Sequence, residues 1–135
     1  MKVVIAGSRS ITDFEIVKQA IVESGFEVTQ VISGTARGVD TLGAQYGKEN
    51  NIPVREMSAN WDYWGKIAGW KRNEEMAEVA DALVAIWLID ENGEGSKGTR
   101  NMISIAKRKG LKIFVKEIRK PIPQNLENLP LFKKE

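Results

Sequence analysis

The sequence contains no cysteine and no histidine. The absence of cysteine excludes disulfides, a thiolate nucleophile and a thiolate metal site. Without histidine the chain can form no Ser-His triad, and it lacks the most common general base and the usual zinc ligand. Any catalysis would depend on carboxylates, amines, guanidinium groups, hydroxyls or backbone amides. We therefore expect no metal site and no bound cofactor.

Long apolar runs are also missing. The most apolar segment, ALVAIWL at residues 82–88, is far too short to cross a membrane, and MKVVIAGSRS at the start lacks the apolar stretch of a signal peptide. We therefore expect no membrane partner and a cytoplasmic location. The formal net charge is only +2, so the total charge alone neither requires nor excludes a nucleic-acid partner.

The pattern that is present predicts an α/β fold. The chain has 135 residues, 42% of them hydrophobic, which is enough for one domain with a buried core. Short apolar runs predict strands at 3–6, 26–32, 53–57, 82–88 and 112–115.

Segments with helical periodicity separate these strands, and the first begins with a capping box formed by Thr12 and Glu15. This alternation predicts a three-layer sandwich, in which helices cover both faces of a parallel sheet of about five strands. Residues 1–116 would form the domain, and 117–135, with three prolines, an irregular tail.

Three glycine-containing loops follow predicted strands and precede predicted helices: AGSRSITD (6–13), SGTARGVD (33–40) and ENGEGSKGTRN (91–101). Each loop by itself could be no more than a tight turn, with Arg37 paired to Asp40. Together they favour a ligand site, because loops at the carboxyl ends of parallel strands meet in one crevice. Arginine and helix N-termini attract phosphate or carboxylate. Neither GxGxxG nor a Walker loop is present.

The predicted ligand-binding residues of these loops are glycines, hydroxyl-bearing residues, arginines and single acid and amide side chains. They are Gly7, Ser8, Arg9, Ser33, Gly34, Thr35, Arg37, Gly38, Asp40, Gly98, Thr99 and Asn101.

The segment ANWDYWGKIAGWKRNEEM (59–76) holds three of the four tryptophans. Trp61, Arg72 and Asn73 are candidates for stacking on a base and binding its sugar. A hydrophobic plug or a subunit interface explains the aromatic residues equally well. Trp70 shares an apolar helical face with Ile67, which predicts that it lies in the core. We expect SANWDYWGK to be irregular.

Two carboxylates are candidates for catalysis. Asp40 stands in the first turn of a predicted helix, where capping of backbone amides is the favoured role. Asp62 lies near Lys66 and is either a general base or a solvated charge.

Five ordered motifs resemble the SLOG superfamily, the SMF/DprA and LOG group of Rossmann-like domains, and in particular its small stand-alone YspA-related branch of bacteria and phages. They are Gly7-Ser8-Arg9, the run from Gly34 to Asp40, Trp61 with Gly65 and Ala68 to Asn73, the strand led by Asp81, and Gly98-Thr99 with Asn101-Met102-Ile103. The resemblance covers roughly residues 1–115.

The resemblance implies a Rossmann-like fold, a crevice for a nucleotide or nucleotide-derived ligand, and a homo-oligomer. Some relatives are sensors of NAD-derived or cyclic nucleotides. Others hydrolyse the N-glycosidic bond of nucleoside monophosphates with a glutamate, whose place Met102 takes in this chain. A thioether is neither acid nor base, so Asp40, Asp62 or Glu94 would have to act instead.

Three functions follow as hypotheses. The first is binding of a nucleotide by a sensor or scavenger. The second is hydrolysis or transfer at an N-glycosidic bond. The third is binding of single-stranded nucleic acid, which the small net charge makes the weakest of the three.

Overall fold

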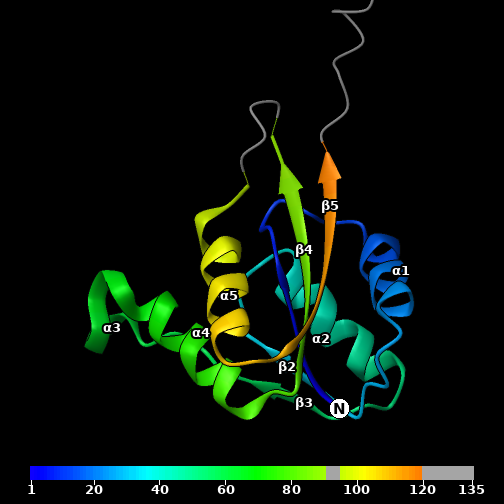
Figure 1. The fold of residues 1–135 in the computed structure, drawn as a ribbon, viewed down its shortest axis with the longest axis horizontal. Coiled ribbons are helices and arrows are strands. Elements are labelled where there is room, and N and C mark those ends of the chain that lie inside the picture. The colour runs from blue at the N-terminus through cyan, green and yellow to red at the C-terminus, as the bar shows by residue number, and fades with distance from the viewer. Residues whose placement is uncertain (91–94, 120–135) are drawn as a thin grey trace, which may run out of the picture.

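The computed structural model describes residues 1–90 and 95–119 (Figure 1). Five parallel strands form one sheet in the order β3-β2-β1-β4-β5. The strands are β1 (Lys2–Gly7), β2 (Gln30–Ser33), β3 (Val54–Glu56), β4 (Ala82–Ile89) and β5 (Lys112–Arg119). The helices are α1 (Phe14–Ser24), α2 (Val39–Glu49), α3 (Trp61–Trp64), the short 3-10 helix η1 (Gly65–Ile67), α4 (Ala68–Val79) and α5 (Lys97–Arg108).

Two apolar clusters, one on each face of the sheet, form the core. Alternate residues of β1 point to opposite faces, so Val3 and Ile5 join α1 and α2, whereas Val4 and Ala6 join α4 and α5. Strand β4 is buried on both faces, as its continuous apolar run predicts. The predicted three-layer α/β sandwich is therefore confirmed.

Several predicted boundaries differ from the structure. Asp13, rather than Thr12, caps α1, because its Oδ1 accepts a hydrogen bond of 3.0 Å from the amide of Glu15. Phe26 and Val28 pack on the core but precede β2, which begins only at Gln30. Strand β5 continues to Arg119, beyond the predicted end at residue 115.

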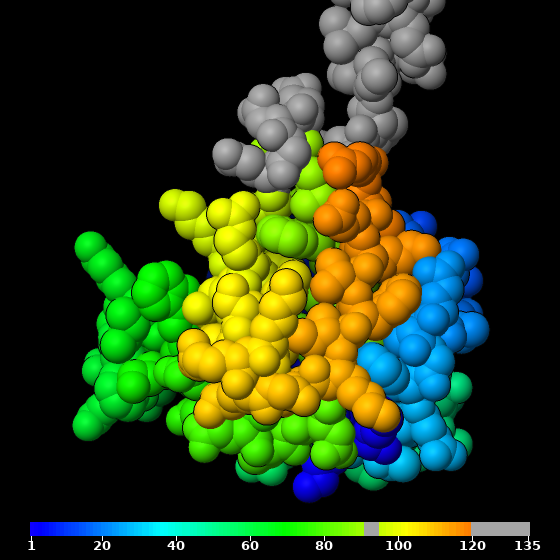
Figure 2. All heavy atoms as spheres, viewed as in Figure 1, coloured from blue at the N-terminus to red at the C-terminus, as the bar shows by residue number. Residues whose placement is uncertain are grey.

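The aromatic segment is ordered rather than irregular. Asn60 caps α3 by accepting a hydrogen bond of 3.1 Å from the amide of Tyr63, and η1 leads directly into α4. The prediction that Trp70 lies in the core is wrong, since 55% of this residue is exposed. The reason is geometric: α3 and the start of α4 lie to one side of the sheet (Figure 1) and protrude from the molecular surface as the green lobe of Figure 2. Trp61, Trp64 and Trp70 of this segment are therefore exposed.

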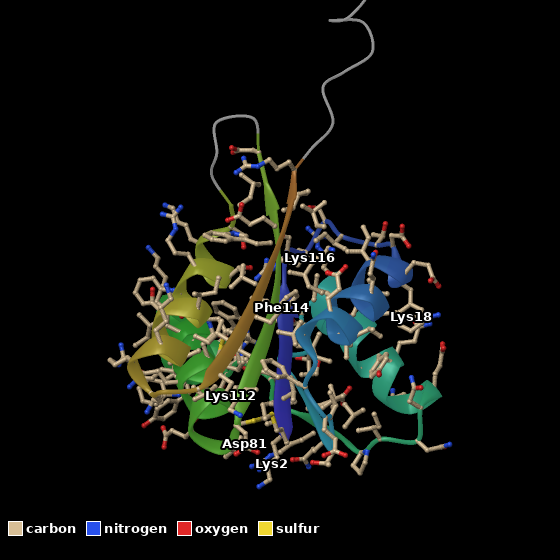
Figure 3. All side chains as sticks on the ribbon, turned by 45° about the vertical axis from the view of Figure 1, so that its right-hand side comes forward. Lys2, Lys18, Asp81, Lys112, Phe114 and Lys116 are labelled. Atoms are coloured by element: carbon tan, nitrogen blue, oxygen red, sulfur yellow. The ribbon has the colours of Figure 1, made fainter. Side chains whose placement is uncertain are left out.

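The amino ends of three strands are joined at Asp81. Its side chain accepts a hydrogen bond of 2.8 Å from the amide of Lys2, near which it lies in Figure 3. Its own amide donates to the Lys2 carbonyl at 2.8 Å, and its carbonyl accepts from the amide of Lys112 at 3.2 Å. These bonds fix the register of β1, β4 and β5 at the end opposite to the loops described below.

None of the helices formed by residues 1–90 and 95–119 combines the length and the apolar character that crossing a membrane requires.

At its carboxyl end β1 touches β4 and α2 so closely that only glycine fits. A Cβ on Gly7 would lie 2.0 Å from the carbonyl oxygen of Ile86 and 2.9 Å from Cγ2 of Val39. Gly38, just before α2, has a φ of 78°, and a Cβ there would lie 2.5 Å from the carbonyl oxygens of Ser8 and Arg9. These two positions let the loops after β1 and β2 lie directly against each other.

We predict that Gly7→Ala lowers the free energy of unfolding by about 1–3 kcal/mol, because backbone atoms of β4 would have to move. Gly98→Ala is the control, since nothing lies within 4 Å of a Cβ at this helical position and alanine favours a helix. Urea denaturation of both variants measures the difference. Equal stabilities of Gly7→Ala and the parent protein would contradict this packing.

Candidate functional site

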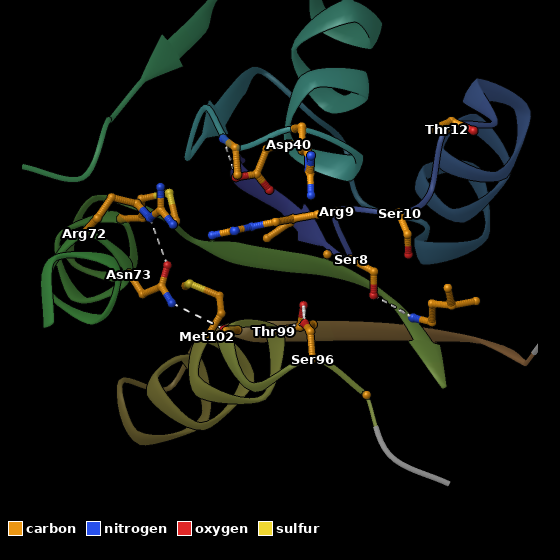
Figure 4. Close-up of a pocket in the computed structure, with 18 of the residues that line it drawn as sticks. Ser8, Arg9, Ser10, Thr12, Asp40, Arg72, Asn73, Ser96, Thr99 and Met102 are labelled. Carbon is orange, nitrogen blue, oxygen red and sulfur yellow. Dashed lines mark hydrogen bonds between the residues drawn. The ribbon is translucent and has the colours of Figure 1, made fainter. Parts of the chain in front are cut away.

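A large cavity lies beyond the carboxyl ends of β1 and β4, and has a volume of about 780 Å³ (Figure 4). At this point of the sheet the chain order reverses: β1 is followed by α1 on one face, and β4 by α5 on the other. Loops that diverge in this way leave a crevice between them. Here the loops after β1, β2 and β4 form its walls together with the middle of α4.

Ser8 joins the walls at the bottom of the crevice. Its amide donates to the carbonyl of Ile86 at 3.1 Å, and its Oγ accepts from the amide of Leu88 at 2.9 Å. The carbonyl of Ser8 accepts from the amide of Val39 at 3.3 Å. One buried serine therefore holds β1, β4 and the start of α2 in place.

Arg72 of α4 reaches across to the loop after β2. Its Nη1 donates to the carbonyl oxygen of Gly34, and its Nε donates to Oδ1 of Asn73 at 3.1 Å. A Cβ on Gly34 would lie 2.7 Å from Oδ2 of Asp40 and 2.8 Å from Nη1 of Arg72. Because Gly34 has no side chain, the carboxylate of Asp40 and the guanidinium of Arg72 can both lie close to its backbone.

Asn73 continues this network to the third loop. Its Nδ2 donates to Oδ1 of Asn101 at 2.8 Å and to the carbonyl of Gly98 at 3.4 Å. Only 5% of Asn73 is exposed, so these bonds satisfy an amide that would otherwise be costly to bury. The loop after β2, helix α4 and the start of α5 are therefore connected by side chains far apart in the sequence.

Asp40 is the buried acid of the site, with 4% of the residue exposed. Its Oδ2 accepts a hydrogen bond of 3.2 Å from the amide of Ala36, and its carbonyl accepts one of 3.0 Å from Ser33. Burial raises the pKa of Asp40 from 3.8 to about 6, although Arg72, two backbone amides and Arg9 oppose this shift. The carboxyl group therefore titrates close to neutral pH.

Positive charge exceeds negative charge around this acid. Burial lowers the pKa of Arg72 below its ordinary value; Asp40 opposes that shift, and the nearby charge of Arg9 reinforces it. Arg9 and Arg37 are exposed and line the cavity, and Figure 4 shows the Arg9 side chain extended into it. This arrangement of guanidinium groups is suited to binding an anion.

The structure brings together most of the predicted site residues. The large cavity is lined by Gly7, Ser8, Arg9, Arg37, Asp40, Arg72, Asn73, Gly98 and Thr99. A smaller adjoining cavity is lined by Gly34, Thr35 and Trp61, together with the same three arginines. Ser33, Gly38 and Asn101 line neither cavity and instead hold the loops in place.

The other acidic candidates differ in position. Asp62 is exposed on α3 and lines neither of the two cavities. Glu94 lies outside the described residues. Met102, which takes the place of the glutamate, is almost fully buried and lines the large cavity.

Sequence reasoning missed several lining residues. They are Ala6, Ser10, Thr12, Ala36, Met76, Leu88, Asp90, Gly95 and Ser96. A helix-capping signal could have found Ser96, because its Oγ accepts from the amide of Thr99 at 3.3 Å and donates to Oγ1 of Thr99 at 2.7 Å. Met76 lines the cavity because of the way α4 packs against the sheet, and no local sequence pattern reveals this packing.

Within the described parts of the chain, no group of three or more acidic side chains is arranged to hold a metal ion.

Asp40 is expected to make the free energy of unfolding decrease as pH rises. Because its folded pKa exceeds its unfolded value, the folded state holds the proton more tightly, and stability falls as pH rises from about 4 to about 6. Asp40→Asn removes this ionisation. A change in pKa from 3.8 to about 6 corresponds to about 3 kcal/mol. The free energy of unfolding of Asp40→Asn, relative to that of the parent, should therefore rise by up to about 3 kcal/mol between pH 4 and pH 7.5.

Urea denaturation at several pH values measures this difference, and Asp62→Asn at the exposed α3 position is the control. The control should keep a constant difference from the parent. If the difference between Asp40→Asn and the parent is also constant over this pH range, Asp40 does not titrate as stated.

Comparison with known proteins finds similarities in sequence and in fold. Residues 1–64 match the family described as YspA, cpYpsA-related SLOG family. Among solved structures, DNA processing protein A (DprA) from Streptococcus pneumoniae has a similar fold, with a TM-score of 0.64 and 18% sequence identity. The similarity covers 84% of this chain and 49% of that one, so this chain spans about half of the length of DprA. The search of curated proteins gave no match.

At 18% identity the likeness to DprA shows the fold alone. It confirms the predicted Rossmann-like architecture, and the match of residues 1–64 confirms the predicted resemblance. Residues 1–64, which contain the loops after β1 and β2, are thus similar to the YspA-related SLOG family.

Proposed function

We propose that the protein binds a nucleotide or a nucleotide-derived small molecule in the crevice beyond β1 and β4. The observation that carries this proposal is the convergence of Arg9, Arg37 and Arg72 on one cavity of about 780 Å³. This volume lies in the range of small-molecule sites. The amino end of α5 borders the same cavity through Gly98 and Thr99 and adds a favourable dipole for an anion.

The side chains divide into two roles. Arg9 and Arg37 are exposed at the cavity and bind the phosphate directly. Arg72 positions the cavity wall, because its Nη1 and Nε donate to Gly34 and Asn73, and it adds its positive charge to the cavity. The hydroxyls of Ser10 and Thr12, also in the cavity wall, offer donors and acceptors for a sugar.

The first test is binding of AMP to the Arg37→Ala variant, measured by isothermal titration calorimetry. Loss of a charge-assisted hydrogen bond to phosphate should weaken binding about ten- to a hundredfold. Arg55→Ala on β3 is the matched control, because Arg55 is also an exposed arginine but lines neither the large nor the smaller cavity. Adenosine, which lacks the phosphate, should bind the parent and Arg37→Ala equally weakly.

Equal affinity of the parent and Arg37→Ala for AMP would contradict the assignment of phosphate to this arginine. Failure of AMP, GMP, CMP, UMP and diadenosine pyrophosphate to bind or to raise the melting temperature would contradict the proposed function itself.

A second candidate function is cleavage of the N-glycosidic bond of a nucleoside monophosphate, and the observation that favours it is Asp40. A carboxyl group with a pKa of about 6 in a ligand cavity is suited to proton transfer near neutral pH. Ionised Asp40 would accept a proton from the water whose oxygen forms the new bond to C1′. As the bond from C1′ to the base breaks, the base would take up a proton from solvent, and Asp40 would release its proton to solvent to restore the carboxylate. Met102, in the same cavity, has no group that could do this.

Incubation of the protein with nucleoside monophosphates, followed by chromatography for free base, tests this activity. Release of base by the parent and Asp62→Asn, with a loss of at least about a hundredfold in Asp40→Asn, would support it. The absence of free base at high protein concentration would leave binding as the function.

A further inference from the structure

The smaller cavity adjoins the large one and shares its charged wall. Its volume is about 450 Å³, and Arg9, Ala36, Arg37 and Arg72 line both cavities. We infer that the ligand has two lobes joined by a pyrophosphate: a nucleotide in the large cavity, a second nucleoside in the smaller one, and the bridge at the three shared arginines. This inference rests on the proposed function and specifies the class of ligand.

The shared wall is suited to more than one negative charge. Three arginines meet there, whereas the acidic residues Asp40 and Asp90 line only the large cavity. Among the described residues, no acid lines the smaller cavity. The charge of Arg9 also disfavours protonation of Arg72, so the guanidinium groups are close enough to repel each other. A pyrophosphate bridge would place one negative charge on each of two neighbouring phosphates, so its charge would be spread along the wall that carries the three guanidinium groups.

The far end of the smaller cavity has an aromatic surface. Trp61 lines it and is 53% exposed. Its ring packs against α4, because a Cβ on Gly69 would lie 3.6 Å from Cη2 of Trp61. Exposed tryptophan beside arginine is a favourable stacking surface for a nucleobase. Thr35 and Ser58, whose hydroxyl oxygens lie 3.0 Å apart, form a polar part of the same wall.

Trp64 is a matched control on the same helix. It is 38% exposed, packs edge-to-face on Tyr63 with ring centroids 4.8 Å apart, and has Nζ of Lys71 4.6 Å from its ring centroid. It lines neither cavity. Trp61→Ala and Trp64→Ala therefore both remove an exposed tryptophan from α3, but only the first changes the proposed second lobe.

The experiment compares three probes by calorimetry: AMP, ATP and diadenosine 5′,5′-pyrophosphate, in which the adenine base represents a purine in general. Diadenosine pyrophosphate should bind the parent at least about tenfold more tightly than AMP or ATP, because only it fills both cavities. Trp61→Ala should lose about tenfold in affinity for diadenosine pyrophosphate and less than about twofold for AMP. Trp64→Ala should bind all three probes as the parent does.

Several results would overturn the inference. If AMP binds and diadenosine pyrophosphate binds no more tightly, the smaller cavity holds no second nucleoside, while the proposed function stands. The same conclusion follows if Trp61→Ala weakens the binding of neither AMP nor diadenosine pyrophosphate. If ATP matches diadenosine pyrophosphate, the smaller cavity holds phosphates and not a nucleoside. If an oligodeoxynucleotide binds more tightly than diadenosine pyrophosphate, with a steep dependence on salt, the two cavities form part of a nucleic-acid groove. Failure of every mononucleotide and of diadenosine pyrophosphate to bind overturns the proposed function as well.

Discussion

The site depends on one interaction, the hydrogen bond from Arg72 to the carbonyl of Gly34. Arg72 lies on α4 and Gly34 after β2, and the pair is separated by 38 positions in the chain. Through Asn73 the same contact extends to Gly98 and Asn101 at the start of α5. Partial burial of a guanidinium is costly, and Asp40 beside it reduces that cost only in part, because its own pKa is raised to about 6. The result is a preorganised cavity wall with an excess of positive charge.

The sheet explains why this wall stands where it does. Reversal of the strand order between β1 and β4 sends α1 and α5 to opposite faces, which leaves the loops after these strands apart. Gly7 and Gly38 then let the loops after β1 and β2 pack against each other, so the exposed Arg9 and Arg37 line one cavity. The chemistry of the site therefore follows from a few backbone approaches that only glycine permits.

Much of the fold and part of the site were predictable from local patterns. Apolar runs such as 82–88 identify buried strands, and glycine with arginine after a strand identifies a loop at the carboxyl edge of the sheet. The position of Trp70 was not predictable, because it depends on how far α4 projects beyond the sheet rather than on helical periodicity. Likewise, no local pattern shows that Arg72 contacts Gly34, or that Ser33 and Asn101 hold loops and line neither the large nor the smaller cavity. The homo-oligomer and the cytoplasmic location stay predictions. The irregular tail predicted from residue 117 is wrong for residues 117–119, which belong to β5, and its remainder lies outside the described residues.

The central claim is that an anionic group binds at the carboxyl edge of the sheet, between the loops after β1, β2 and β4. Backbone amide NMR during titration with AMP tests it most directly. The account predicts concentrated chemical-shift changes at residues 8–10, 36–38 and 96–99, which surround the cavity. Changes confined to Lys107–Lys109 at the opposite end of α5, or spread evenly over the sheet, would contradict it.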